Sequence, residues 1–306
     1  MHRHIRLLLL SLLLPLPGIA TAEIEDFIRY ATYDRIYLSP KGSHMAVTHR
    51  QDRVEMLSVF RLPSFELVSS TRYASDLGIS QIYWASEERM LIQPARRHPT
   101  RDDFKTPTGE LAAMDVDGSN RDMLWGWKSG RGQLGTLVRK KEGSVTWARV
   151  IDLLPEDPKH VLIQNGSYDL SGMRAGIRNE AFLLDVRNGE TRRVARSPIK
   201  NGYFVPDIEH QVNVVAGQNE AGDFEVYVRE SGKPFELKHT TELNDGNIRP
   251  LMPSTRPGYY LFADSVTQPV EGLVEWNPVT DDRREVFRHP QVDVARFYAA
   301  PYPRLW

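Results

Sequence analysis

Few residues in this sequence have the types and spacing that catalysis requires. A serine nucleophile on a strained strand-to-helix turn needs glycines two residues before and after it, in the pattern G-x-S-x-G. The nearest approach is Gly78-Ile79-Ser80-Gln81-Ile82, which lacks the second glycine and runs into a β-prone segment. We therefore predict that Ser80 is a loop residue with no nucleophilic role, and we predict no catalytic residue in this chain.

The histidines do not form a recognisable metal motif. Those that follow residue 22 are His44, His49, His98, His160, His210, His239 and His289. No H-E-x-x-H or H-x-H pattern occurs among them, although imidazole ligands usually come in such pairs. His44 and His49 are five residues apart, which places them on opposite faces of an extended strand. We predict exposed turn histidines, no metal site and no cofactor.

Two charged segments resemble ligand loops without meeting their requirements. Asp115–Asn120 begins like a calcium loop, but an EF-hand needs glycine at the sixth position and glutamate at the twelfth, where this chain has Asn120 and Gly126. We interpret it as a β-turn of the Asp-Gly type. The basic stretch Arg139–Lys141, preceded by Lys128 and Arg131, has no phosphate-loop spacing. It is interpreted as a solvated loop, with docking of a partner as the minority interpretation.

Aromatic and acidic residues on predicted strands were weighed as binding or catalytic groups. The aromatic residues are Trp84, Trp147, Tyr203, Phe204, Tyr259 and Tyr260. Their strand positions favour packing between sheets over a ligand-stacking platform. Asp152 and Asp207 are the only obvious acids on the predicted first strands, whereas a glycosidase needs two carboxylates about 5–10 Å apart. We expect no glycosidase activity.

The first 22 residues have the features of a secretory signal peptide. Arg3 and Arg6 precede an apolar run from Leu7 to Leu16, and Ala20-Thr21-Ala22 matches an A-x-A cleavage site. We expect cleavage after Ala22 and a periplasmic or secreted protein. Removing the two arginines leaves 37 basic against 40 acidic residues, which indicates no nucleic-acid or membrane-surface partner. The chain has no cysteine, so stability must come from a hydrophobic core.

Residues 23–306 are punctuated by turns and predict an all-β fold. The only helical candidate is Ile24–Tyr30. In Ile36–Val47, two β-prone runs flank Ser39-Pro40-Lys41-Gly42, in which Pro40 and Gly42 favour a tight turn. Similar second-strand segments recur at Met45–Val47, Met90–Ile92, Val161–Ile163, Val212–Val215 and Tyr260–Phe262. Their spacing of about 40–50 residues, with one longer interval, is typical of four-stranded propeller blades.

First strands and following hairpins recur at the same spacing. The predicted first strands are Ile36–Leu38, Ile82–Trp84, Val150–Leu154, Tyr203–Val205, Ile248–Met252 and a sixth at Val294–Tyr298. The predicted hairpins turn at Asp117–Asn120, Asn188–Gly189, Ser231–Gly232 and Pro278–Asp281. The longer interval is explained by two polar insertions, Pro94–Thr108 and Trp127–Trp147. We predict a β-propeller of five full blades plus the opening strand of a sixth, incomplete at its C-terminus.

Several segments resemble the propellers of prolyl oligopeptidase-family (S9) peptidases. Leu38–Val47 is similar to the S-P-D-G-x-x-[IL]-A-[FV] repeat of that family and of TolB-type propellers, with Lys41 in place of the aspartate. Ile82–Trp84 with Glu88–Ile92 resembles the "W…ERLLV" second blade, and Asp152–Ile163 resembles the "LPDDPxHVLV" stretch of the acylaminoacyl-peptidase-like branch. Leu111–Ser119 resembles the "LYAVNVDGS" hairpin.

This resemblance implies a propeller that caps a C-terminal α/β-hydrolase domain. In the family, that domain carries the Ser, Asp and His that hydrolyse short peptides, and the propeller limits access. We therefore expect a hydrolase domain as the partner in the intact protein, with peptide substrates acting through that domain. The chain by itself is expected to be inactive, with no catalytic, cofactor-binding or metal-binding residue. The alternative is a free-standing TolB-like periplasmic propeller that binds a protein or a small ligand.

Overall fold

The computed structural model describes residues 33–51, 54–98, 104–126, 129, 146–167 and 178–294. Within this part the regular elements are β-strands, and no helix long and apolar enough to cross a membrane is found there. The expected signal peptide over 1–22, the helix predicted at Ile24–Tyr30 and the basic residues Arg139–Lys141 lie outside the described residues.

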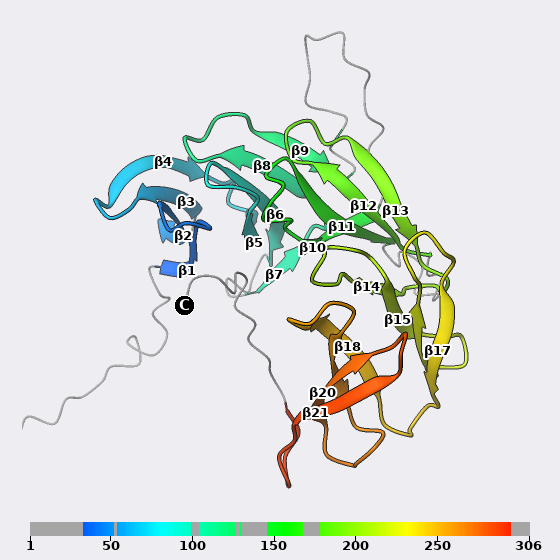
Figure 1. Cartoon of the computed structure of the whole chain (residues 1–306). Coiled ribbons are helices and arrows are strands. Elements are labelled where there is room, and N and C mark those ends of the chain that lie inside the picture. Colours follow the sequence, from blue (N-terminus) through cyan, green and yellow to red (C-terminus); the bar gives the residue numbers. More distant parts are fainter. Residues whose placement is uncertain are drawn as a thin grey trace, which may run out of the picture. The chain divides into compact units, whose positions relative to one another are not determined.

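The strands form five antiparallel sheets, each built from one continuous segment of the chain (Figure 1). Sheet 1 contains β1 (Tyr33–Leu38), β2 (His44–Gln51), β3 (Val54–Arg61) and β4 (Glu66–Arg72). Sheet 2 contains β5 (Leu77–Trp84), β6 (Arg89–Arg97), β7 (Lys105–Pro107), β8 (Leu111–Asp115) and β9 (Asp122–Trp125). Sheet 3 contains β10 (Thr146–Asp152), β11 (His160–Ser167), β12 (Glu180–Asp185) and β13 (Thr191–Arg196).

The last two sheets have the same plan. Sheet 4 contains β14 (Tyr203–Val205), β15 (Val214–Gln218), β16 (Phe224–Val228) and β17 (Glu236–Thr241). Sheet 5 contains β18 (Ile248–Pro253), β19 (Tyr260–Asp264), β20 (Gly272–Asn277) and β21 (Asp282–Phe287). In every sheet, four strands pair in the order in which they follow along the chain, so each sheet contains a four-stranded meander. In sheet 2 the meander is β5-β6-β8-β9, and β7 is an additional strand that pairs with β6.

The turns between strands follow from their residues. Gly42 has a φ of +71°, a conformation that costs glycine nothing, and its N–H donates to Ser39 O at 2.9 Å. At the predicted Asp-Gly turn, Gly118 has a φ of +82° and its N–H donates to Asp115 O at 2.9 Å. Both predicted turns are therefore confirmed, and the interpretation of Asp115–Asn120 as a hairpin turn holds.

Four hydrophobic clusters fill the four seams between consecutive sheets. The first joins Leu57 and Val59 of sheet 1 to Ile82 and Trp84 of sheet 2. The second, third and fourth join sheets 2 and 3, sheets 3 and 4, and sheets 4 and 5 in the same way. Each sheet thus buries apolar side chains against its neighbours in the chain, as sheets that pack face to face must do.

At two of the seams, the first strands of neighbouring sheets contact each other. β1 contacts β5, and β14 contacts β18. In Figure 1 the first strands lie on the inner side of the row of sheets, and the fourth strands β4, β13 and β17 lie on the outer side. Four-stranded meanders that follow one another face to face, with their first strands at the inner edge, are the blades of a β-propeller. The predicted fold class and the five predicted full blades are confirmed; the sixth predicted strand lies beyond Val294, outside the described residues, and Val294 itself is in no strand.

Several local predictions were wrong. Ser80 is not in a loop but inside β5, at a β-bulge between Ile79 and Gln81, because the β-prone run continues through it. His44 and His49 are in β2, His160 is in β11 and His239 is in β17, so these four are strand residues and not turn histidines. Tyr259 precedes β19 and lies outside a strand.

The first predicted insertion is partly regular structure. β6 continues through Pro94 to Arg97, and β7 pairs with this extension from Lys105 to Pro107. The hairpin therefore extends sheet 2 beyond the four strands that the other sheets have. Of the second insertion, Thr146 and Trp147 open β10, and most of the rest lies outside the described residues.

Candidate functional site

The first strands of the five sheets present polar side chains along the inner edge. We call this set the inner-edge band. Its members are Arg35 and Tyr37 of β1, Gln81 and Tyr83 of β5, Arg149 of β10, Tyr203 of β14 and Arg249 of β18. Arginines and tyrosines on adjacent strands are able to bind anionic or polar ligands, so the band is the candidate functional site.

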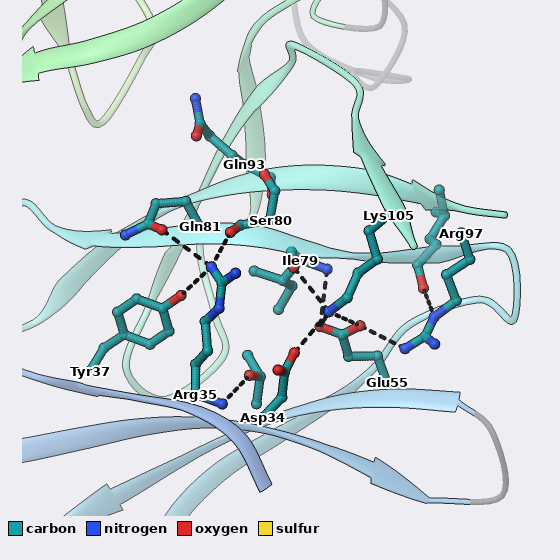
Figure 2. A network of polar contacts seen from close by, with 12 residues as sticks. Asp34, Arg35, Tyr37, Glu55, Ile79, Ser80, Gln81, Gln93, Arg97 and Lys105 are labelled. Carbon is teal, nitrogen blue, oxygen red and sulfur yellow. Dashed lines mark hydrogen bonds and ion pairs between the residues drawn. The ribbon is translucent and has the colours of Figure 1, made fainter. Parts of the chain in front are cut away.

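Arg35 joins sheet 1 to sheet 2. Its Nη1 donates to Ser80 O at 2.6 Å and, at longer range, to Gln81 Oε1 at 3.4 Å and Tyr37 Oη at 3.5 Å. Figure 2 shows the guanidinium held between these three groups. All three partners are uncharged, so the positive charge of Arg35 is hydrogen-bonded without being neutralised by them.

Gln93 of β6 links sheet 2 to sheet 3. Its Nε2 donates to Ala148 O at 3.1 Å, and its Oε1 lies 3.5 Å from the Tyr83 hydroxyl. Burial raises the pKa of Tyr83, while the charge of Arg149 acts in the opposite direction. Tyr83 is therefore a neutral phenol near physiological pH.

Tyr203 links sheet 4 to sheet 5. Its hydroxyl donates to Pro250 O at 3.1 Å. Burial raises the pKa of Tyr203, and the guanidinium groups of Arg249 and Arg149 oppose that effect because they stabilise the phenolate. Arg249 is itself paired with Glu271, at 3.0 Å between Nη2 and Oε1. Polar contacts of the band thus join sheet 1 to sheet 2, sheet 2 to sheet 3, and sheet 4 to sheet 5.

A buried ionic cluster lies beside the band at the first seam. We call Glu55, Arg97, Lys105 and Asp34 the Glu55 cluster. The Glu55 carboxylate is 1% exposed and lies 2.7 Å from Arg97 Nη2 and 3.0 Å from Lys105 Nζ. It also accepts a hydrogen bond from Ile79 N at 3.1 Å. Figure 2 shows both cations turned toward the same carboxylate. The lone pairs of this carboxylate are therefore satisfied by β5, β6 and β7 of sheet 2.

Asp34 completes the Glu55 cluster at its exposed side. Lys105 Nζ lies 2.9 Å from Asp34 Oδ2. Burial alone would raise the pKa of Asp34, but the hydrogen bond and the charge of Lys105 outweigh it and hold the pKa below its ordinary value. Lys105 therefore bridges two carboxylates of sheet 1 and fixes the β6–β7 hairpin to that sheet.

A second ionic cluster holds sheets 2 and 3 together at the opposite ends of their strands. Arg89 is fully buried, with Nη1 2.7 Å from Asp115 Oδ1 and Nε 2.6 Å from Val186 O. Arg187 binds the same carboxylate at 2.8 Å. Burial by itself would raise the pKa of Asp115. The hydrogen bonds that its carboxylate accepts from Asn120, Arg89 and Arg187 lower this pKa by more than burial raises it, so the net pKa is depressed. This arrangement fits a structural clamp.

The two acids weighed for glycosidase chemistry have other partners. Asp152 Oδ2 lies 2.7 Å from His210 Nδ1, across the seam between sheets 3 and 4. Asp207 accepts hydrogen bonds from Gln211 N and Asn213 Nδ2 and so stabilises the β14–β15 loop. Both carboxylates are engaged in holding loops, which is the structural alternative to general acid–base work.

The weighed serine and the aromatic residues are also structural. Ser80 Oγ donates to Gln93 O at 3.0 Å, a contact within sheet 2. Packing between sheets is confirmed for Trp84, Phe204 and Tyr260, which belong to three of the hydrophobic clusters. Tyr259 instead donates to Asp282 Oδ2 at 2.6 Å in a loop. Within the described residues, no group of three or more histidine, aspartate or glutamate side chains is placed to hold a metal ion.

Neither the inner-edge band nor the Glu55 cluster was predicted from the sequence. Asp34, Glu55, Arg97 and Lys105 are separated by up to 71 residues, and only the pairing of sheets 1 and 2 brings them together. A signal for the band was available, however. Arg249 lies within a predicted first strand, and Arg35 and Arg149 each stand one residue before one, so extending the predicted first strands by one residue and aligning them would have placed all three at the same edge.

Comparison with known proteins gives likeness of fold only. No family model and no curated protein matches the sequence. Among solved structures, the chain is similar to an acylaminoacyl peptidase from Pyrococcus horikoshii, at 12% identity and a TM-score of 0.45, over 84% of this chain and 39% of that one. The chain thus spans about two fifths of that peptidase's length.

The chain is also similar to two further solved structures. The β-propeller domain of the Trilobed protease from Pyrococcus furiosus matches at 10% identity and a TM-score of 0.38, over 83% of this chain and 71% of that one. TolB from Acinetobacter baumannii matches at 12% identity and a TM-score of 0.38, over 85% and 56%. The chain is an all-β propeller of four-stranded blades.

Proposed function

We propose that this chain is the non-catalytic propeller of an exported prolyl oligopeptidase-like serine peptidase, in which it limits access to a separate catalytic domain. The observation that supports this is the position of the family-like motifs. Leu38–Val47 spans the β1–β2 connection, Ile82–Ile92 spans β5–β6, and Asp152–Ile163 spans β10–β11. Three consecutive blades therefore carry their motifs at the same first-to-second-strand connection.

The chemistry of the chain agrees with a non-catalytic role. The sequence contains no G-x-S-x-G elbow, and Ser80, the nearest approach, lies inside β5 with its hydroxyl bound to Gln93 O. A nucleophile needs a base within hydrogen-bond reach, whereas the Ser80 hydroxyl is bound to a backbone carbonyl. Hydrolysis is therefore assigned to the domain that the propeller would cover.

The coding sequence beyond Trp306 provides the direct test. We expect it to encode, in frame or after a frameshift, a domain with a G-x-S-x-G elbow and downstream aspartate and histidine. The longer protein should hydrolyse N-acetylated peptide p-nitroanilides, whereas residues 23–306 alone should not. Absence of any such domain would contradict the proposal and would favour the free-standing, TolB-like binding propeller.

Export is the second part of the proposal. The Arg3–Ala22 segment has the order of charged, apolar and small residues that a signal peptidase requires. Expression of the full chain in a bacterium with a periplasm should give a mature protein whose first residue is Glu23, as read by N-terminal sequencing of the periplasmic fraction. Recovery of the uncleaved chain in the cytoplasm would contradict export.

A further inference from the structure

We propose that Asn201, in the connection between sheets 3 and 4, is a modification site at which the folded protein spontaneously loses a side-chain amide. Asparagine is a thermolabile residue, most of all before glycine, because glycine has no Cβ to shield its nitrogen from the preceding side chain. The sequence contains three Asn-Gly pairs, which begin at Asn165, Asn188 and Asn201. Contacts in the structure protect the first two pairs and leave the third open.

The first pair is protected by the strand ladder of sheet 3. Asn165 is 7% exposed in β11, and its Oδ1 accepts a hydrogen bond from Glu180 N at 2.7 Å. In the pairing of β10 with β11, Asn165 is opposite Ala148 and Gly166 is opposite Trp147. Turning the peptide group between Asn165 and Gly166 toward the side chain would therefore break the pairing of two strands.

The second pair is exposed, but its reacting groups are held in hydrogen bonds. Asn188 lies in the turn between β12 and β13 and is open to solvent. The Gly189 N–H, whose nitrogen would attack, donates to Asp185 O at 2.9 Å. The Asn188 carboxamide, which would be attacked, accepts from Glu190 N at 2.8 Å. Access to water is therefore not enough at this turn, because two hydrogen bonds must break before the groups can meet.

The third pair has neither kind of protection. Asn201 is exposed, and it precedes β14 without being part of a strand. Within the residues that the structure describes, neither the Asn201 side chain nor the Gly202 N–H makes a hydrogen bond. The hydrogen bond that holds this connection is accepted by Gly202 O, from Asn179 Nδ2 at 2.9 Å. It is made on the far side of Gly202 from the peptide group that reacts.

The fold itself accounts for an Asn-Gly pair at this place. A Cβ on residue 202 would collide with Ser197 Oγ and would lie 2.9 Å from Val215 Cγ1, so only glycine fits. Asn201 has a φ of +53°, a left-handed conformation that asparagine adopts more readily than most residues with a side chain. The connection thus selects both residues for their backbone conformation, and their chemical lability follows from that choice.

The proposed reaction is an internal substitution followed by hydrolysis. The Gly202 nitrogen bonds to Asn201 Cγ, the Cγ–Nδ2 bond breaks, and Nδ2 leaves as ammonia with the proton of the Gly202 N–H. Water then opens the cyclic imide at either carbonyl and gives aspartate or isoaspartate. Either product places a new negative charge next to the exposed Lys200–Glu220 ion pair.

The test follows the three amides in the folded and in the unfolded protein. The purified chain is kept in warm, mildly alkaline buffer with and without concentrated urea, digested with pepsin in acid, and analysed by mass spectrometry. In the folded protein we expect Asn201 to lose its amide at least about tenfold faster than Asn188, because reaction at Asn188 must first break two hydrogen bonds. In urea the three rates should become similar, since only the fold distinguishes the pairs.

Two variants and one label make the test specific. Asn201→Gln should abolish the loss at this position, because the longer side chain would have to close a larger ring. Asn188→Gln is the matched control and should leave the loss at Asn201 unchanged. Labelling of the parent protein with an isoaspartyl methyltransferase should mark the peptide that contains residue 201, and this readout requires no substitution.

Three results would overturn the proposal. The first is a loss at Asn165 or Asn188 that equals or exceeds the loss at Asn201 in the folded protein. The second is an intact Asn201 in the folded protein after the time in which the chain in urea has lost this amide. The third is an unchanged total loss in Asn201→Gln. All three readouts are independent of whether a hydrolase domain is encoded beyond Trp306.

Discussion

The first and last seams of this propeller both contain a hydrophobic cluster, but only the first adds a buried ionic cluster to it. At the first seam, the Glu55 cluster joins sheets 1 and 2 through a carboxylate that is 1% exposed. At the last seam, Tyr260, Phe262 and Trp276 pack with aliphatic residues of sheet 4, and the rings of Phe262 and Trp276 are 4.7 Å apart. One architecture thus accepts apolar packing alone at one seam, and apolar packing combined with a buried ionic cluster at another.

This difference shows where single substitutions should be costly and why. A buried ion pair tolerates no loss of one partner, because the remaining charge is left without compensation in a medium of low polarity. Truncation of a side chain in an apolar seam also lowers the free energy of unfolding, but this loss scales with the volume of the atoms removed. The predictions below probe this contrast, beginning with the largest expected effect.

Glu55→Gln should be the most destabilising change at the first seam. It removes the charge that compensates Arg97 and Lys105, whose side chains are 5% and 17% exposed, and should lower the free energy of unfolding by about 3–5 kcal/mol. Urea denaturation of both proteins measures the loss. Glu66→Gln is the control, because the Arg61–Glu66 pair is exposed and should cost about 0–1 kcal/mol. Similar losses in the two variants would contradict an ionic first seam.

Ile248→Ala should test the last seam by volume alone. Ile248 is 1% exposed in the fourth hydrophobic cluster, and truncation of such a residue costs about 2–5 kcal/mol. Ile248→Val should cost about 0.5–1.5 kcal/mol, since only one methylene is lost. A loss in the valine variant as large as that in the alanine variant would show that the seam does not depend on volume.

Lys105→Met should weaken the first seam less than Glu55→Gln, by about 1–2 kcal/mol at pH 7, because Glu55 keeps Arg97 and Ile79 N. The variant should also change the acid sensitivity. Because the pKa of Asp34 is depressed in the folded state, its contribution is present above its ordinary value of 3.8 and is lost as the pH falls below it. A stability profile from pH 5 to pH 3 should therefore fall less steeply in Lys105→Met than in the parent chain.

His239→Gln should give the smallest effect and only in mild acid. His239 contacts the edge of Trp276 at the last seam, and burial, with the charge of Arg283, lowers its pKa. Because the folded state disfavours the charged imidazole, stability should decline as the pH falls below about 6.5, the ordinary pKa. In His239→Gln the part of the decline between pH 7 and pH 5 that comes from this group should vanish. An identical slope in both proteins would exclude His239 as its source.

The arrangement of strands was predictable because turn chemistry is local. Gly42 and Gly118 sit at φ values that few other residues adopt, and each marks a hairpin whose strands then follow. The repeat of that unit at blade length gave the fold class. Ser80 was wrongly predicted to lie in a loop. It stands at a β-bulge inside β5, and the local sequence at a bulge looks the same as the local sequence at the end of a strand.

The contacts of the candidate site were not predictable in the same way. Glu55 meets Arg97 and Lys105 only after sheets 1 and 2 have formed and packed, and no spacing in the chain encodes that meeting. β7 was missed because its three residues pair with an extension of β6 that continues through Pro94, a residue that normally argues against a strand.

The contiguity of each sheet has a mechanical consequence. Because Tyr33–Arg72 makes all of sheet 1 and every later sheet is likewise one uninterrupted segment, tension applied to the two ends of the described chain acts on the sheets in series. Each blade can then be peeled away without unthreading another. Extension at about 3.5 Å per residue would lengthen the molecule by roughly 140 Å for sheet 1. Stretching in an optical trap should therefore give a staircase of similar steps, with the blade bounded by the weaker seam released first.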